Sequence, residues 1–234
     1  IDLAVHSYKD LPTDNPLPLK VAAVLERRDV RDTLVAPAGI DFLDDPDYEA
    51  VIATGSNRRK AQWLNRYPKH KIVPLRGNVN TRLAKVKENG WDGAIFAAAG
   101  LQRINLEHHI SQYLDWMIPA PAQGAVAVMI REDDEATAST LATLNHASTA
   151  QCTAAERVFL NTMEAGCSSP VGAYAYIERE QLHLQAIALS MDGAQRFDYE
   201  SSVPPRQAKI LGKTAADALL EEGAFQVIQG SDND

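Results

Sequence analysis

Cysteine and long apolar runs are both scarce in this chain of 234 residues. Its two cysteines, Cys152 and Cys167, are too few for a disulfide framework, and free thiols are favoured, although the two could still pair. The longest apolar candidates, such as residues 94–99, are short enough for buried strands and fall far below the roughly 18–20 residues of a membrane-spanning helix. We therefore expect neither a disulfide scaffold nor a membrane-spanning segment.

Positive charge is also in deficit, with 23 lysines and arginines against 31 aspartates and glutamates and a net charge of −8. This balance argues against broad nucleic-acid binding, which normally shows a basic face. An initial methionine and a targeting segment are absent as well, and residues 1–5 read as a strand already under way that ends at His6-Ser7. We infer that a natural N-terminal portion lies outside these residues, so the missing signal says little about localisation.

What the chain does have is 45% hydrophobic residues and enough length for two or three compact units. Between residues 51 and 106, short apolar runs alternate with helical stretches, a pattern typical of a parallel α/β sheet. We predict strands over 51–54, 71–75 and 93–97, and helices over 57–66 with Ser56 as N-cap, over 78–88 before Gly90, and over 98–105. The stretch 118–130 is expected to return the chain into another strand.

The pattern changes after residue 130. Helices are predicted over 134–145 and 150–163, followed by three strands over 171–178, 182–191 and 195–203 and a last helix over 207–222. Asp192-Gly193, between the last two strands, is a strong hairpin signal. Consecutive strands followed by a helix indicate an α+β domain.

Arginine gathers where the predicted strands of the α/β part end; the five residues concerned are Arg58, Arg59, Arg76, Arg82 and Arg103. Because the carboxyl ends of parallel strands share one edge, at least three of these side chains should converge. A cation in the first turn of a helix opposes the macrodipole by roughly 0.3–1 kcal/mol, which makes sense if a carboxylate or phosphate binds there. The sequence thus predicts a site for a multiply charged anion. The alternative for each arginine is solvation or pairing with an acid of the chain.

Two loops carry further candidate chemistry. Lys9-Asp10 follows the first strand and offers a cation for a carboxylate and a carboxylate for proton transfer or cation stabilisation; a surface ion pair is the alternative. Cys167 lies in the loop 164–170 just beyond a predicted helix, whereas Cys152 lies within a helix, as a buried inert cysteine would. Cys167 is therefore the better candidate for covalent chemistry.

Seven segments, in order along the chain, resemble the porphobilinogen deaminase (hydroxymethylbilane synthase) family. They are Val5–Thr13, Glu26–Asp32, Thr54–Arg59, Leu75–Arg82, Ala98–Arg103, Pro119–Ala125 and Gly166–Ala175. The chain departs from the family pattern at Asn57, where leucine is usual, and at Ala53, where glycine is common. The family's earlier segment, with further cleft residues, is absent from this chain.

The resemblance implies an α/β fold with two α/β domains of the periplasmic-binding-protein type and a small C-terminal α+β domain. Domain 1 would be discontinuous, over residues 1–25 and 124–144. Domain 2 would cover residues 26–122 and hold the arginine-rich cleft, and domain 3 would cover residues 145–234 and carry the cofactor loop.

The resemblance also implies a transferase that deaminates four porphobilinogen molecules and joins them head to tail into hydroxymethylbilane, in tetrapyrrole (haem and chlorophyll) biosynthesis. Asp10 matches the catalytic aspartate, and a dipyrromethane cofactor would be attached to Cys167 by a thioether. The other expected cofactor-binding residues are Ser7, Lys9, Arg58, Arg59, Arg76, Asn78, Arg82 and Gln123, and the expected substrate-binding residues are Thr54, Ser56 and Arg103. No metal is implied.

The main alternative is a non-catalytic two-domain binding protein that closes on a polycarboxylate ligand. It would share the fold and the arginines, but would need neither Asp10 nor Cys167. A ligand-sensing regulator is disfavoured because no helix-turn-helix or basic face is evident. We expect porphobilinogen as the small-molecule partner, no nucleic-acid or membrane partner, a monomer, and a cytoplasmic location; an organelle-targeting segment stays open because the N-terminal portion is absent.

Overall fold

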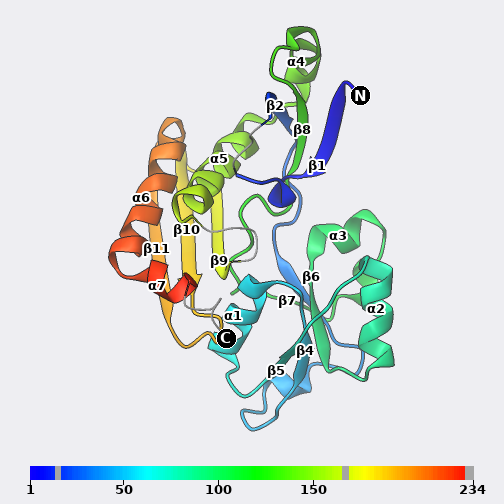
Figure 1. Ribbon diagram of the computed structural model, residues 1–234. Helices are drawn as coiled ribbons and strands as arrows, with labels where there is room; N and C mark the ends of the chain where they lie inside the picture. The colour runs from blue at the N-terminus through cyan, green and yellow to red at the C-terminus, as the bar shows by residue number, and fades with distance from the viewer. Residues whose placement is uncertain (14–16, 165–168, 230–234) are drawn as a thin grey trace.

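The computed structural model describes residues 1–13, 17–164 and 169–229, and these form three sheets (Figure 1). The first sheet is antiparallel, with strand order β1 (Leu3–Ser7), β8 (Val126–Arg131) and β2 (Leu19–Val24). Helix α4 (Glu135–Leu141) packs on it through a small core that includes Ala23, Ile130 and Leu141. Segments from the two ends of the first 131 residues are thereby joined in one sheet.

The second sheet has five strands in the order β5 (Lys71–Val73), β4 (Val51–Ala53), β6 (Gly93–Ala97), β3 (Asp32–Val35) and β7 (Gln112–Tyr113). Strand β4 is parallel to β5 and β6, as predicted. Strand β3 runs antiparallel to both β6 and β7, so the complete sheet is mixed, although its three predicted strands are parallel. The prediction began at residue 51 and missed β3, which is short and buried at every position.

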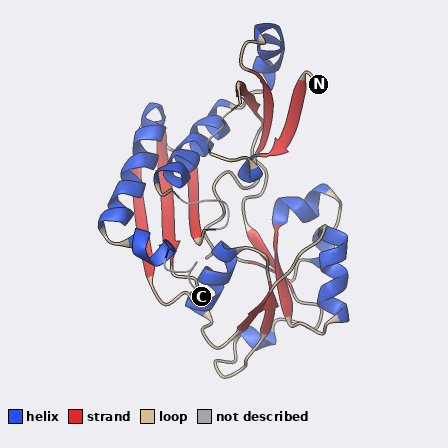
Figure 2. Cartoon of the chain, viewed as in Figure 1, coloured by secondary structure: helices blue, strands red, loops and turns tan. Residues whose placement is uncertain are grey.

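Helices cover both faces of the second sheet (Figure 2). Helix α1 (Asn57–Arg66) buries Trp63 on one face, while α2 (Val79–Glu88) and α3 (Ala98–Arg103) bury Val86 and Leu101 on the other. Ser56 caps α1 as predicted, accepting a hydrogen bond from the backbone N–H of Arg59. The local capping signal therefore located the start of α1.

The third sheet is an antiparallel meander of β9 (Val171–Glu178), β10 (Gln181–Leu189) and β11 (Arg196–Val203). Helices α5 (Ala147–Thr162) and α6 (Ala208–Glu221) pack on one face of it, and α7 (Ala224–Gln229) follows. This unit confirms the predicted α+β character of the C-terminal part. Helix α1, which covers the second sheet, also contacts β10 of the third sheet (Figure 1). Ala61 of α1 packs there with Ile187 and Leu189 of β10.

Several predicted boundaries were wrong. Strand β1 runs through His6 and Ser7, because these residues pair with β8, and β2 and β7 were not predicted. Helix α5 begins three residues earlier than expected, at Ala147, since the His146 side chain caps it. The predicted helix 134–145 divides into α4 and a 3₁₀ turn over Ala142–Leu144. Within the described ranges, no helix is long and apolar enough to cross a membrane.

Candidate active site

A cavity of about 540 Å³ lies where the second sheet, the loop after β1 and the start of the third sheet meet. Its described lining carries five cations, Lys9, Arg58, Arg59, Arg76 and Arg82, and one carboxylate, Asp10. Ser56, Gln123 and Ser169 also line this first cavity. Four of the five arginines singled out in the sequence therefore converge, which confirms that at least three meet; their binding roles stay predictions.

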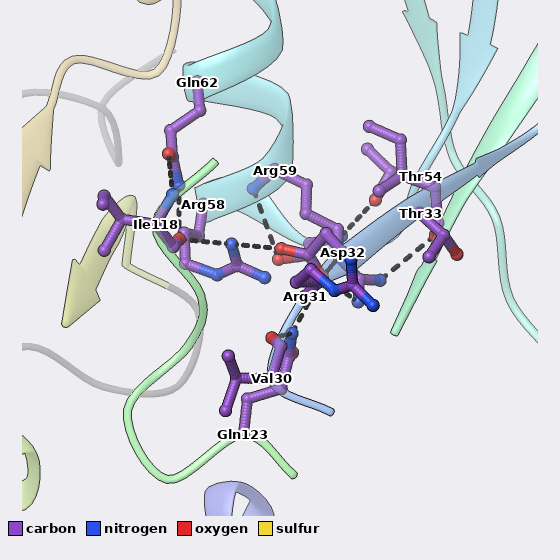
Figure 3. A network of polar contacts seen from close by, with 12 residues as sticks. Val30, Arg31, Asp32, Thr33, Thr54, Arg58, Arg59, Gln62, Ile118 and Gln123 are labelled. Carbon is purple, nitrogen blue, oxygen red and sulfur yellow. Dashed lines mark hydrogen bonds and ion pairs between the residues drawn. The ribbon is translucent and has the colours of Figure 1, made fainter. Parts of the chain in front are cut away.

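Asp32 lies buried at the base of this arginine cluster and was given no role from the sequence (Figure 3). Arg58 donates to its Oδ2 at 2.7 Å, and Arg59 donates to its Oδ1 through Nε at 2.9 Å and Nη2 at 2.7 Å. Gln123 Nε2 adds a hydrogen bond of 3.0 Å to the same Oδ1. Burial alone would raise the pKa of Asp32, but the charges of Arg58 and Arg59 and these hydrogen bonds hold it below the ordinary range.

The single carboxylate of Asp32 faces the two guanidinium groups of Arg58 and Arg59, so these three residues together carry an excess of positive charge. Arg58 also donates to the carbonyl of Ile118 at 2.7 Å, and Arg59 to that of Ile95 at 3.1 Å. The Nε of Arg58 is nevertheless a buried donor without a hydrogen-bond partner, the one such side-chain atom among the described residues. A buried orphan donor is costly, and an anionic ligand in the cavity would supply the missing acceptor. The donors present therefore fit a carboxylate-bearing cofactor.

Arg76, which follows β5, and Arg82, which lies in α2, also line the first cavity. Arg82 Nε donates to the carbonyl of Gly77 at 2.6 Å, and burial together with the nearby Arg59 lowers the pKa of Arg82. Gly55 lets the segment before α1 lie against the segment after β5, because a Cβ at position 55 would lie 2.6 Å from the Leu75 carbonyl oxygen. Any larger residue at position 55 would push the start of α1 away from the end of β5.

Lys9 and Asp10 lie on a 3₁₀ turn, Tyr8–Asp10, that follows β1 directly. The Lys9 Nζ donates to Gln123 Oε1 at 3.2 Å, and burial, reinforced by the charge of Arg59, lowers the pKa of Lys9 to about 8. Arg157 of α5 fixes the turn by donating to the carbonyl oxygen of Tyr8 at 3.3 Å while its guanidinium lies over the Tyr8 ring. Asp10, the only carboxylate among the described residues that line the first cavity, thus lies on a turn that is held by a contact from α5.

A second cavity, of about 570 Å³, shares Lys9 and Gln123 with the first. Ser7 and Arg103 line this second cavity, so Arg103 does not join the other four arginines. Gln123 thereby lies between the two spaces and is fixed by its bonds to Asp32 and to the Val30 carbonyl.

The remaining predicted site residues lie elsewhere. Thr54 is buried, accepts a hydrogen bond from the Ser56 N–H at 3.2 Å, and lines neither of these two cavities. Asn78 also lines neither, and its side-chain oxygen caps α2 by accepting from the Thr81 N–H at 2.9 Å. Cys167 lies outside the described residues. No group of three or more His, Cys, Asp or Glu side chains in the described part of the chain could hold a metal ion.

A second buried carboxylate was also missed. Glu156 of α5 is fully buried and forms a bidentate ion pair with Arg27, at 2.6 and 3.0 Å. It also accepts from the backbone N–H groups of Ala122 and Ala175. Arg27 in turn donates to the Gln123 carbonyl at 2.9 Å, so this pair positions the turn that carries Gln123. The signal in the sequence was an acid on the helix face that also carries Cys152 and Phe159, where a buried charged residue needs a partner.

The fold and the two cavities define an α/β protein whose arginine-lined cavity carries the donors that suit a multiply charged anion. Residues 1–139 match "Porphobilinogen deaminase, dipyromethane cofactor binding domain", and residues 150–221 match "Porphobilinogen deaminase, C-terminal domain". The chain belongs to the porphobilinogen deaminase family.

Relatives in bacteria agree with this assignment. The porphobilinogen deaminase of Syntrophomonas wolfei is 40% identical over 230 residues, which cover 97% of this chain and 75% of that protein. That of Thermus thermophilus is 41% identical over 231 residues, covering 97% and 76%. Among solved structures, the BvgS periplasmic VFT2 domain of Bordetella pertussis is 18% identical, covers 61% of this chain and 60% of that chain, and superposes with a TM-score of only 0.35. That overlap is too limited to support an argument.

Proposed function

We propose that this chain carries out the porphobilinogen deaminase reaction, in which four porphobilinogen molecules are deaminated and joined head to tail into hydroxymethylbilane. The observation that carries this proposal is the first cavity, whose described lining combines five cations with one carboxylate, that of Asp10. Porphobilinogen carries an acetate and a propionate, so a chain of such pyrroles is the kind of polycarboxylate that this wall of guanidinium groups can bind. A purely anion-binding wall would have no use for a carboxylate facing its ligand.

A dipyrromethane, when bound, supplies the pyrrole terminus to which each substrate unit is joined. Arg58, Arg59, Arg76 and Arg82 would hold its carboxylates, and the orphan Nε of Arg58 offers one donor directly. Because Asp32 fixes Arg58 and Arg59 before any ligand arrives, these two residues are oriented at little further entropic cost.

Asp10 is proposed as the catalytic carboxylate. Loss of ammonia from porphobilinogen leaves an electron-poor pyrrole whose positive charge is shared with the ring N–H. A carboxylate close to that nitrogen stabilises the cation where its charge develops, and it can accept the proton that is lost after the new bond forms. Lys9 and the arginines hold the carboxylates of the substrate and keep the acceptor carbon near Asp10.

Cofactor attachment is proposed at Cys167. Cys152 is an unsuitable alternative, because it is buried in α5 and burial, with the charge of Glu156, raises the pKa of its thiol to about 11. Ser169, two residues beyond Cys167 in the sequence, lines the first cavity. The position of Ser169 in this cavity supports the proposed attachment at Cys167.

The wider organisation follows the sheets. We propose domain 1 over residues 1–25 and 124–144, domain 2 over residues 26–122, and domain 3 over residues 145–234, each containing one of the three sheets. Porphobilinogen is the proposed substrate, Thr54, Asn78 and Gln123 are proposed to act around the cleft, and a cytoplasmic monomer without nucleic-acid partners is proposed.

The experiment that tests this function follows porphobilinogen consumption and hydroxymethylbilane formation by the complete protein as it is expressed. We expect steady turnover, with four substrate molecules consumed for each product molecule. Tight binding of porphobilinogen without consumption would show the binding-protein alternative to be correct.

A further inference from the structure

Arg28 lines the second cavity, together with Lys9 and Arg103, and has so far been given no role. Its side chain is exposed toward the cavity, which is also lined by Ser7, Gln102 and Gln123. Among the described lining residues there is no aspartate or glutamate. Three cations therefore surround a space of about 570 Å³ that holds no compensating carboxylate of its own.

The backbone at Arg28 is fixed. The Arg28 N–H donates to the Gly124 carbonyl at 3.0 Å. Gly124 has φ +80°, and a Cβ there would lie 2.8 Å from the Arg28 carbonyl oxygen, so only glycine permits this approach. Position 28 is thereby tied to the segment that carries Gln123, at the junction of the two cavities.

The residues on either side of Arg28 are anchored through their side chains. Arg27 forms its ion pair with the buried Glu156. The Asp29 carboxylate accepts from Arg31 at 2.7 Å and from Gln102 at 3.2 Å, so it is already engaged by other donors. Arg28 is thus a cation on a fixed backbone beside an acid, Asp29, that is occupied by other donors, and this situation favours an external anion.

Building on the function proposed above, we propose that Arg28 binds a pyrrole acetate or propionate carboxylate in the second cavity. The carboxylate belongs either to the incoming porphobilinogen or to a pyrrole unit already joined to the protein. Arg28 and Arg103 would together hold this carboxylate in the second cavity, which Lys9 and Gln123 separate from the first cavity.

The test compares Arg28→Gln and Arg28→Lys with wild type and with Arg206→Gln, a control at an exposed arginine on the 3₁₀ turn before α6. The complete, cofactor-loaded protein is used, and KM, kcat and the masses of protein-bound intermediates are measured. For Arg28→Gln we expect either a KM for porphobilinogen about tenfold higher, equivalent to about 1.4 kcal/mol, or accumulation of one intermediate. The first result assigns the carboxylate to the incoming substrate, and the second to an attached pyrrole. Arg28→Lys should recover part of the loss.

Kinetics and intermediates of Arg28→Gln that match those of Arg206→Gln, in an active wild-type protein, would overturn this role alone. Equal impairment of Arg28→Gln and Arg28→Lys with a lowered Tm would also overturn it, because only structural damage explains that result. Absence of turnover in wild type would instead overturn the proposed function and this role together.

Discussion

Asp32 and Arg59 are joined by two hydrogen bonds to one carboxylate oxygen, from Nε at 2.9 Å and from Nη2 at 2.7 Å, at the buried base of the first cavity. Arg58 holds the other oxygen at 2.7 Å. The carboxylate thus fixes two guanidinium groups on one wall and neutralises only one of them. We interpret Asp32 as the residue that preorganises the anion site.

Replacing Asp32 with Asn should leave two buried arginines without their counter-charge. Breaking a buried ion pair from one side costs about 3–5 kcal/mol, and we expect a loss of this size in the free energy of unfolding measured with urea. Glu49→Gln is the matched control, because Glu49 forms an exposed ion pair with Lys71 at 2.6 Å and should change stability far less. Equal stability of the two variants would show that Asp32 does not hold the arginines.

Lys9 should make ligand binding depend on pH. Its pKa of about 8 means that its positive charge is lost as the pH rises through that value, and with it a charge-assisted contact to a carboxylate. We expect the KM for porphobilinogen to rise up to about tenfold between pH 7 and 9. Lys9→Arg keeps its charge and should lose this dependence; an unchanged profile in Lys9→Arg would assign the effect to another group.

The same pKa has a consequence for the protein without ligand. An unfolded chain keeps the Lys9 proton up to a pKa of 10.5, whereas the folded chain releases it near pH 8. The unfolded state therefore binds more protons between these values, and the contribution of Lys9 to stability rises with pH over this window. Comparing urea unfolding of wild type and Lys9→Met at pH 7 and pH 9.5 measures this contribution; a difference that does not change with pH would contradict it.

Asp10 is the residue on which the reaction itself should depend. Asp10→Asn keeps the shape and removes the charge, so single-turnover deamination by cofactor-loaded protein should fall by roughly 10²–10⁴-fold, the range for a positioned acid–base group. Porphobilinogen binding should suffer less, because the arginines remain, and Asp10→Glu should retain some activity. A rate equal to wild type would make Asp10 only an ion-pair partner of Lys9.

The sequence predicted what depends on neighbours along the chain. Ser56 was recognised as a cap because its acceptor role spans three residues, and β9 was placed at its observed bounds by its alternation and flanking turns. The role of Asp32 was missed because its partners lie 26 and 27 positions away and become neighbours only through the sheet. The charges in the first turn of α1 did raise pairing with an acid as an alternative for Arg58 and Arg59, and both pair with Asp32, but nothing in the sequence singled out that acid.

The position of Arg103 shows a second limit. All five arginines follow strand ends in the sequence, yet Arg103 lies at the end of α3 and faces the second cavity. Strand order places side chains at an edge of the sheet, but Lys9 and Gln123, which line both cavities, lie between the two spaces. Lys9 follows β1 and Gln123 precedes β8, so their proximity depends on the pairing of these two strands, such as Leu3 with Ile130, which no local pattern reveals.

The most direct measurement is the intact mass of the complete purified protein, followed by mapping of the modified peptide. We predict a covalent dipyrromethane on the peptide that contains Cys167, with Cys152 unmodified because its thiol is buried and its pKa is raised to about 11. Cys167→Ala should carry no adduct and should not turn over porphobilinogen. An unmodified wild-type protein that still makes hydroxymethylbilane, or an adduct on Cys152, would contradict this assignment.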